Sequence, residues 1–287
     1  MRSSLRPAPS RAAAAPARAF RAPELMGVVN ATPDSFFPDS RAKTLDAVVE
    51  KALLLAEQGA RVIDLGGQST RPGSDEVPLE LELERVIPAL TRLAKVLPPH
   101  VYLSVDTDKA EVARRALDAG AKFLNDVSAL RRDPGMAKVA VKYEKVVLMH
   151  RLGDSSKTMQ AAPRYSDAPA EVAAFLRERG AAFFEAGGKF DQLMVDPGIG
   201  FGKELDHNLS LIKRVSSLAA VAPVVLGVSR KSMFGKLHPD SGPQDRLAGS
   251  LAVAAWACYA CVSILRVHDV LETRKLIETL KAVEEAA

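Results

Sequence analysis

The residues best suited to chemistry lie in a glycine-rich stretch, D-P-G-I-G-F-G-K at 196–203, directly after the apolar run 193–195. The apolar run predicts a buried strand, which ends on the carboxylate of Asp196 and opens into a loop. Asp196 can accept hydrogen bonds from the N–H groups of a heterocycle, and Phe201 offers a ring face for stacking. Glycine allows positive φ and lets the backbone come close to a flat ligand. The stretch therefore predicts a site for a flat heterocycle.

Two common nucleotide-binding motifs fail in this stretch because of their spacing. A P-loop requires glycine where Pro197 stands and serine or threonine where Glu204 stands. The dinucleotide fingerprint requires a third glycine where Lys203 stands. The loop is therefore not expected to hold the phosphate tail of a mononucleotide.

Eight short apolar runs, separated by helical patterns, are the elements that must position these residues. The strands are predicted at 26–30, 62–65, 101–105, 123–125, 146–149, 193–195, 224–228 and 262–266. The helices are predicted at about 44–58, 79–95, 109–119, 134–143, 170–188, 205–219, 245–260 and 270–285. Regular alternation in one continuous domain favours an α/β fold, a (β/α)8 TIM barrel over residues 26–287. A doubly wound open sheet is the alternative, and the missing dinucleotide fingerprint disfavours it.

The composition of the chain argues against several classes of protein. Residues 1–23 contain five arginines and no acid, so the 39 basic residues less these five leave 34 against 35 acidic residues. A nearly neutral body does not indicate a nucleic-acid partner. The longest apolar run, 251–265, is shorter than the ~20 residues that a bilayer requires, so no membrane partner is expected. The two cysteines, Cys258 and Cys261, make neither a disulfide framework nor a zinc site, and a reducing cytoplasm is the simpler expectation.

The Arg/Ala/Pro-rich segment 1–25 is predicted to be a disordered tail, because it holds too few apolar residues to bury a core. An organelle transit peptide over 1–23 has the same composition and stays open as an alternative.

Polar or polarisable residues follow every predicted strand. In a barrel, the carboxyl ends of the strands and the loops after them build the active site. The residues at these ends are Asn30, Asp64, Asp106, Asn125–Asp126, Met149–His150, Asp196, Ser229–Lys231 and Arg266–His268. Burying so many polar groups without partners is costly, so we expect them to share one binding site.

Eight segments at these positions resemble those of the dihydropteroate synthases. They are N-A-T-P-D-S-F (30–36), D-L-G-G-Q-S-T-R-P-G (64–73), S-V-D-T (104–107), N-D-V (125–127), L-M-H (148–150), D-P-G-I-G-F-G-K (196–203), S-R-K-S (229–232) and R-V-H-D (266–269). The resemblance runs in order from residue 26 to the C-terminus. It implies a pterin-binding barrel enzyme of folate synthesis, which joins (7,8-dihydropterin-6-yl)methyl diphosphate to p-aminobenzoate and releases pyrophosphate.

The resemblance also implies a set of pterin-binding residues. They are Asp106, Asn125, Val127, Met149, Asp196, Phe201, Gly227 and Lys231. The two acids can accept hydrogen bonds from ring N–H groups, and the amide of Asn125 can donate and accept beside them. Met149 and Phe201 supply polarisable apolar walls. For Asp106 the alternative is an N-cap of the helix predicted at 109–119.

On the leaving-group side, the resemblance implies that Asn30, Arg266 and His268 bind the diphosphate. Asn30 is also the expected protein ligand of Mg²⁺, the expected cofactor, with the diphosphate as the main ligand. Lys231, Arg266, His268 and Asp106 are the expected catalytic residues. Departure of the diphosphate then leaves a pterin-stabilised carbocation that the neutral arylamine captures.

For p-aminobenzoate, the resemblance implies Thr70, Arg71, Pro72 and Ser232, with the loop after the second strand closing over the bound pterin. A main-chain N–H or the hydroxyl of Ser232 takes the carboxylate. The family further implies a homodimer through the last helices, for which the alanine-rich run 252–260 is a candidate contact.

The chain departs from the family pattern in three places. In the first loop, Ser35 is followed by Phe36-Phe37-Pro38-Asp39-Ser40, so the acidic residue is shifted to Asp39 and the usual glycine pair is missing. Gln68 stands for a common glutamate, and Arg151 stands for a usual methionine.

Two other functions remain open. One is a pterin-dependent methyltransferase that passes a methyl group to a corrinoid protein, which has no use for Lys231, Arg266 and His268 as a diphosphate and arylamine site. The other is a catalytically silent pterin-binding barrel, which the altered first loop favours.

Overall fold

The structure is a computed structural model that describes residues 19–31, 41–68, 74–153, 163–240, 242 and 245–286. Several predictions lie outside the described residues. They concern the tail before residue 19, the altered first loop at 36–40, and Thr70, Arg71 and Pro72.

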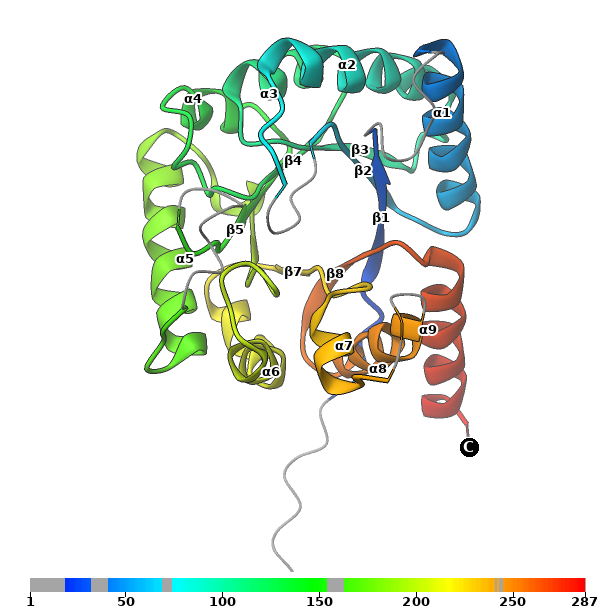
Figure 1. Cartoon of the computed structure of the whole chain (residues 1–287), viewed down its shortest axis with the longest axis vertical. Coiled ribbons are helices and arrows are strands. Elements are labelled where there is room, and N and C mark those ends of the chain that lie inside the picture. The colour runs from blue at the N-terminus through cyan, green and yellow to red at the C-terminus, as the bar shows by residue number, and fades with distance from the viewer. Residues whose placement is uncertain are drawn as a thin grey trace, which may run out of the picture.

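Eight parallel strands close into a barrel in which each strand pairs with the next along the chain and β8 pairs with β1. The strands are β1 Glu24–Asn30, β2 Val62–Gly66, β3 Tyr102–Asp106, β4 Phe123–Asp126, β5 Lys145–Met149, β6 Leu193–Asp196, β7 Val224–Leu226 and β8 Val262–Val267. Figure 1 shows the helices as an outer ring around these strands. The predicted TIM barrel is confirmed.

The helices alternate with the strands as the apolar periodicity predicts. They are α1 Arg41–Glu57, α2 Leu79–Val96, α3 Ala110–Asp118, α4 Met136–Ala140, α5 Ala168–Glu185, α6 Leu205–Lys213, α7 Met233–Leu237, α8 Arg246–Cys258 and α9 Val270–Glu284, with short 3₁₀ helices η2 Phe190–Gln192 and η3 Val215–Ala220. In α2 the buried stripe Val86, Ala89, Leu90 and Leu93 repeats at helical spacing and faces the sheet. Within the described part of the chain, no helix is long and apolar enough to cross a membrane.

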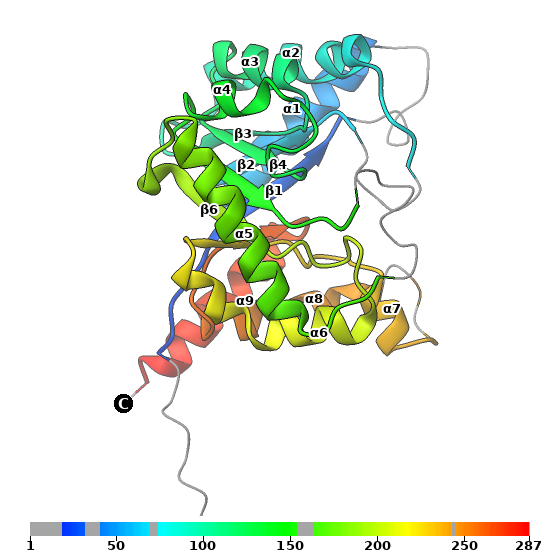
Figure 2. The same cartoon turned by 90° about the vertical axis from the view of Figure 1, so that its left-hand side faces the viewer.

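Alternation along the strands separates two apolar layers. Inside the barrel lies a small cluster made of Met26, Val62, Phe123, Val147, Met194, Val225 and Ile264. The residues between them, such as Ile63 and Leu65, belong to the larger core between strands and helices. Because each helix runs back against its strand, the C-terminus lies on the side of the barrel away from the carboxyl ends of the strands (Figure 2).

The structure corrects several predicted boundaries. Strand β1 begins at Glu24, which pairs with Ile264 of β8, so residues 24 and 25 belong to the barrel rather than to the tail. The helix predicted at 205–219 is α6 followed by the separate 3₁₀ helix η3. Helix α7 was not predicted, because its five residues are too few to show a helical period.

Candidate active site

The candidate site is the next interior layer above the apolar cluster inside the barrel. Side chains alternate along a strand, so the second residue after each member of that cluster also points into the barrel. These second residues include Asp64, Asn125, Met149, Asp196, Gly227 and Arg266. The sequence therefore changes from apolar to polar within one step of the strand period, at the carboxyl end where a barrel places its active site.

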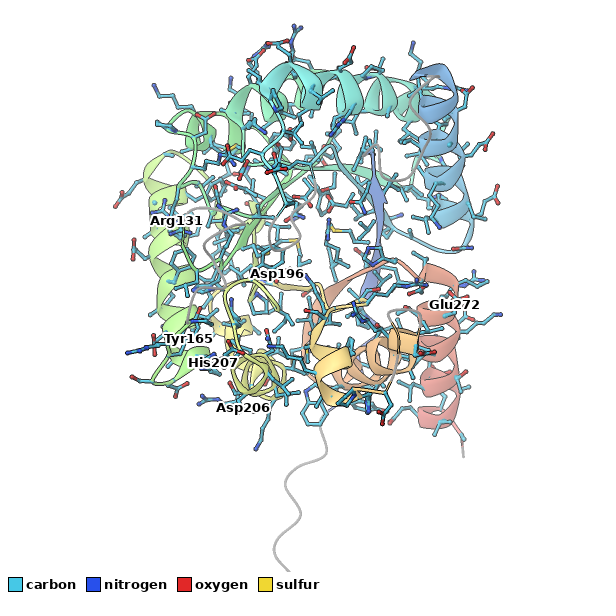
Figure 3. The ribbon with its side chains drawn as sticks, in the orientation of Figure 1. Arg131, Tyr165, Asp196, Asp206, His207 and Glu272 are labelled. Carbon is cyan, nitrogen blue, oxygen red and sulfur yellow. The ribbon has the colours of Figure 1, made fainter. Side chains whose placement is uncertain are left out.

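A cavity opens on this layer. Its lining residues are Asp106, Asn125, Val127, Met149, Asp196, Gly198, Ile199, Phe201, Gly227, Lys231 and Arg266. Every residue predicted to bind pterin lines this cavity, and Arg266 joins them. In Figure 3 Asp196 lies at the centre of the barrel mouth.

A charged network crosses the floor of the cavity. Arg266 Nε lies 2.6 Å from Asp64 Oδ2, and Arg266 Nη2 lies 2.8 Å from Asp106 Oδ2. Asp64 is fully buried and also accepts from Ser104 Oγ at 2.5 Å and from Asn125 Nδ2 at 3.1 Å. Asp64 therefore holds Arg266 and Asn125 toward the cavity, a role that the sequence analysis did not assign to it.

Asp106 keeps one oxygen available for a ligand. Its Oδ1 atom is buried and has no hydrogen-bond partner among the described residues. Burial raises the pKa of Asp106 to about 7, although the charge of Arg266 lowers it. The alternative assignment of Asp106 as a helix cap is wrong, because Lys109 is the N-cap of α3 and Asp133 Oδ2 accepts from the Ala110 N–H at 2.8 Å.

The glycine-rich loop has the backbone that its sequence predicts. Gly198, Gly200 and Gly202 adopt φ of 65°, 83° and 69°. The Gly198 N–H donates to Asp196 Oδ1 at 2.7 Å, which orients that carboxylate. Burial raises the pKa of Asp196, and this hydrogen bond and the charge of Lys231 lower it.

Lys231 contacts the apolar wall of the cavity. Val127, Met149 and Phe201 form a small apolar cluster, and Lys231 Nζ lies 4.3 Å from the centroid of the Phe201 ring. Burial lowers the pKa of Lys231 to about 8. Cation and ring together make a surface that suits a flat, electron-rich ligand.

Among the described residues predicted for the diphosphate and for p-aminobenzoate, Arg266 lines this cavity, and Asn30, His268 and Ser232 do not. Asn30 is exposed at the end of β1, and Ser232 is exposed before α7. His268 follows β8, and its Nδ1 atom lies 3.1 Å from Ser229 Oγ. Burial, and then the charge of Arg266, lower the pKa of His268 to about 4, so the ring is neutral at pH 7.

Comparisons with known proteins agree with this geometry. A family model described as "Pterin binding enzyme" matches residues 26–268. The dihydropteroate synthase of Escherichia coli (strain K12) is 43% identical over 263 residues, covering 91% of this chain and 91% of that protein. The chain belongs to the dihydropteroate synthase family of pterin-binding enzymes.

Solved structures of the family share the fold closely. The Xanthomonas albilineans dihydropteroate synthase with 4-aminobenzoic acid has a TM-score of 0.85 and 43% identity, covering 92% of this chain and 94% of that chain. The Xanthomonas albilineans enzyme in complex with 7,8-dihydropteroate has a TM-score of 0.81 and 40% identity, covering 92% and 95%.

The structure shows the contacts of two residues that depart from the family pattern, Gln68 and Arg151. Gln68 Oε1 accepts from Lys109 Nζ at 2.9 Å, and Lys109 also pairs with the buried Glu82. Glu82 already neutralises Lys109, so a neutral side chain at position 68 leaves no unpaired charge. Arg151 is buried, and its guanidinium lies 3.9 Å from Asp108 rather than lining the pterin cavity.

No cluster of three or more histidine, cysteine or acidic residues that could hold a metal occurs in the described ranges. Asp64 and Asp106 are paired with Arg266, whereas Asn30 is exposed at the end of β1 and carries a neutral amide oxygen. Such a donor set fits Mg²⁺ that is held mainly by substrate phosphates and water.

Proposed function

We infer that this chain catalyses dihydropteroate synthesis, joining (7,8-dihydropterin-6-yl)methyl diphosphate to p-aminobenzoate. Besides the membership of this family, one structural observation supports this function. All the residues predicted to bind pterin converge on one cavity, where Asp106 Oδ1 is buried without a partner among the described residues. A pterin N–H group can donate to that oxygen. Because the oxygen is buried, a ligand without such a donor would leave it unpaired at a cost in free energy.

Pterin recognition follows from the chemistry of the cavity. The ring presents a donor–acceptor edge similar to that of guanine, so Asp106 and Asp196 accept its N–H groups and Asn125 pairs beside them. Met149 and Phe201 contact the two-ring plane. Lys231 Nζ lies over the Phe201 ring in the free protein. When the pterin stacks on Phe201, the ammonium group moves aside and donates to a heteroatom of the pterin.

We propose a dissociative reaction. The C–O bond to the diphosphate breaks first, and its electron pair leaves with the diphosphate. The arylamine nitrogen then donates its lone pair to the methylene carbon and loses a proton to the released pyrophosphate. His268 and Arg266 stabilise the developing charge, since fixed donors act most strongly where charge appears in the transition state.

Mg²⁺ is the proposed cofactor, and it would be bound by Asn30 and mainly by the oxygen atoms of the diphosphate. When bound, it neutralises charge on the leaving group. We propose Ser232, at the start of α7, for the carboxylate of p-aminobenzoate, together with Thr70, Arg71 and Pro72.

A homodimer in the cytoplasm completes the proposal. Trp256 of α8 is 43% exposed and Val283 of α9 is 67% exposed, which supports a contact through the last helices. Ala254, Ala257 and Ala260 are buried within the protomer, so the contact falls to the exposed face around Trp256. Light scattering tests whether the protein is a dimer. The free thiols of Cys258 and Cys261 support the proposed reducing compartment.

The activity is tested by mixing purified protein with the pterin diphosphate, Mg²⁺ and p-aminobenzoate. We expect pyrophosphate and dihydropteroate in equal amounts. Binding of methyltetrahydrofolate without dihydropteroate would favour the methyltransferase, and pterin binding without any product would favour the silent barrel.

Lys231→Ala tests the residue assignment. We expect kcat/KM to fall about a hundredfold or more, because the variant loses a charge that the site aims at the ligand. Lys236→Ala is the matched control, since Lys236 is an exposed lysine that pairs with the exposed Glu204. Near-normal activity of Lys231→Ala would refute the assignment.

A further inference from the structure

Beneath the glycine-rich loop lies a buried lysine that the proposed reaction does not use. Lys203 is 3% exposed and does not line the pterin cavity. Its Nζ atom lies 2.8 Å from His150 Nδ1, 3.0 Å from the Phe201 carbonyl oxygen and 3.4 Å from the His150 carbonyl oxygen. An ammonium group has three protons, and these three acceptors match them.

The protonation state of His150 supports this arrangement. Burial lowers the pKa of His150 to about 2, so the ring is neutral and its Nδ1 can accept. Burial also lowers the pKa of Lys203 to about 7, while the charge of Asp196 raises it. Lys203 therefore needs its acceptors to carry a charge in the interior.

One ammonium group thus fastens two loops together. His150 follows β5, and Phe201 lies in the loop after β6. The His150 ring is held edge-on against Phe175 at 4.8 Å between centroids, and it contacts Tyr165 at 6.1 Å. Tyr165 Oη in turn donates to the Gly202 carbonyl at 2.9 Å, and Figure 3 shows Tyr165 beside α6.

The fit between these loops is close. A Cβ atom on Gly198 would lie 1.9 Å from the His150 carbonyl oxygen, so the loop that orients Asp196 rests directly on the residue that Lys203 holds. The Phe201 carbonyl that Lys203 binds belongs to the residue whose ring faces Lys231. A shift at Lys203 is therefore passed to both the acid and the aromatic wall of the cavity.

We propose that Lys203 is a positioning residue for the pterin site, which fixes Phe201 and Asp196 by tying the loop after β6 to His150. The proposal rests on the proposed function, because it assigns pterin as the ligand of that cavity. Lys203 touches no substrate and acts through its two neighbours.

Lys203→Met tests the proposal, since methionine retains the apolar stem and removes the charge and all three donors. A displacement of about 1 Å in a site can cost roughly a hundredfold. We expect the affinity for the pterin diphosphate, measured by calorimetry without p-aminobenzoate, to fall about tenfold to hundredfold. The KM for p-aminobenzoate at saturating pterin diphosphate should change less than about twofold.

Two further variants separate positioning from loss of folding. His150→Phe retains the ring packing against Phe175 and the bond from Lys203 to the Phe201 carbonyl, so pterin affinity should fall less than in Lys203→Met. The double variant removes donor and acceptor together and should melt nearer the wild type than Lys203→Met does, yet still bind pterin weakly.

Wild-type pterin affinity in folded Lys203→Met, or in the double variant, would overturn the proposal. Equal losses in pterin affinity and p-aminobenzoate KM would also overturn it, because they indicate a general structural role. If the wild-type chain itself neither binds the pterin diphosphate nor makes dihydropteroate, the proposed function fails first and this inference falls with it.

Discussion

At the scale of single residues, the floor of the cavity has more acid than base. Arg266 is shared between Asp64 and Asp106, and burial works against ionisation of the Asp106 carboxyl. Asp106 accordingly titrates near neutral pH, whereas the pKa of Arg266 is raised by the two acids. The site therefore has a proton that can leave when a ligand with N–H donors arrives.

The raised pKa of Asp106 predicts a pH dependence. Its folded-state pKa of about 7 lies above the usual aspartate value of 3.8, so the carboxyl is largely protonated below pH 7 and ionised above it. A carboxylate accepts the pterin N–H better than a neutral acid, so kcat/KM for the pterin diphosphate should rise as pH increases through about 7.

Asp106→Asn removes this titrating group and is the control. We expect a lower kcat/KM that no longer rises in this pH window. A wild-type profile that is flat between pH 6 and 8, or a variant that retains the rise, would show that another group is responsible.

Ser229 predicts the tautomer of His268. Ser229 Oγ accepts the main-chain N–H of His268 at 3.2 Å and lies 3.1 Å from His268 Nδ1. The hydroxyl proton is then donated to Nδ1, which leaves Nε2–H as a donor for a phosphate oxygen. Ser229→Ala should raise the KM of the pterin diphosphate roughly threefold to tenfold, the effect of about one hydrogen bond. Ser229→Thr retains the hydroxyl and should stay near the wild type in steady-state kinetics.

Much of the candidate site was predictable from sequence because strand ends and strand period fix where side chains point. Counting by two from Val62 also places Asp64 inside the barrel, in agreement with its place among the strand-end residues, although no role was assigned to it. The pairing of Asp64 with Arg266, 202 residues away, could not be predicted, because the partner depends on barrel closure. The same holds for Lys203 and His150, which meet only through two loops.

At the scale of elements, long periodic segments were predicted well and short ones were not. Helix α2 has a complete apolar stripe and begins at the predicted residue, Leu79. Helix α7 has five residues, and strand β7 ends at Leu226, two residues before the predicted end. Gly227, the first residue after β7, lines the cavity, and an apolar run does not reveal where such a strand ends.

Gly198→Ala tests the loop after β6. Its φ of 65° is unfavourable for alanine, and the added Cβ would overlap the His150 carbonyl oxygen. We expect the free energy of unfolding to fall by more than about 1 kcal/mol and pterin binding to weaken, as measured by chemical denaturation and calorimetry.

Gly187→Ala is the matched control for that loop. Gly187 has a φ of 100°, yet a Cβ there has nothing within 4 Å, and the residue follows the end of α5. It should lose stability through backbone strain alone and leave pterin affinity unchanged. If both variants bind pterin equally well, the close approach of Gly198 to His150 has no role in the site.

At the scale of the whole molecule, the barrel is closed unevenly. Strands β1 and β2 align over five residue pairs, from Met26 and Val62 to Asn30 and Gly66. Strands β6 and β7 align only at Val195 and Val224. The ladder between β7 and β8 is shifted between Val224 and Val225. Strand β7 is therefore the part of the barrel where strand pairing is weakest.

The cavity spans this part of the barrel, because it is lined by Asp196 at the end of β6, Gly227 after β7 and Arg266 in β8. We predict that the amides of Val224–Leu226 exchange with deuterium faster than those of Val62–Gly66 in the free protein, since fewer neighbouring pairs must open. Binding of the pterin diphosphate should slow exchange in β7 much more than in β2, because the ligand joins the three strands and stabilises the state that binds it. Strand β2 serves as the internal control within the same sample. If the amides of β7 are as well protected from exchange as those of β2 before the ligand is added, the uneven pairing does not destabilise β7. Stabilisation of β7 by pterin would then not be needed to explain binding.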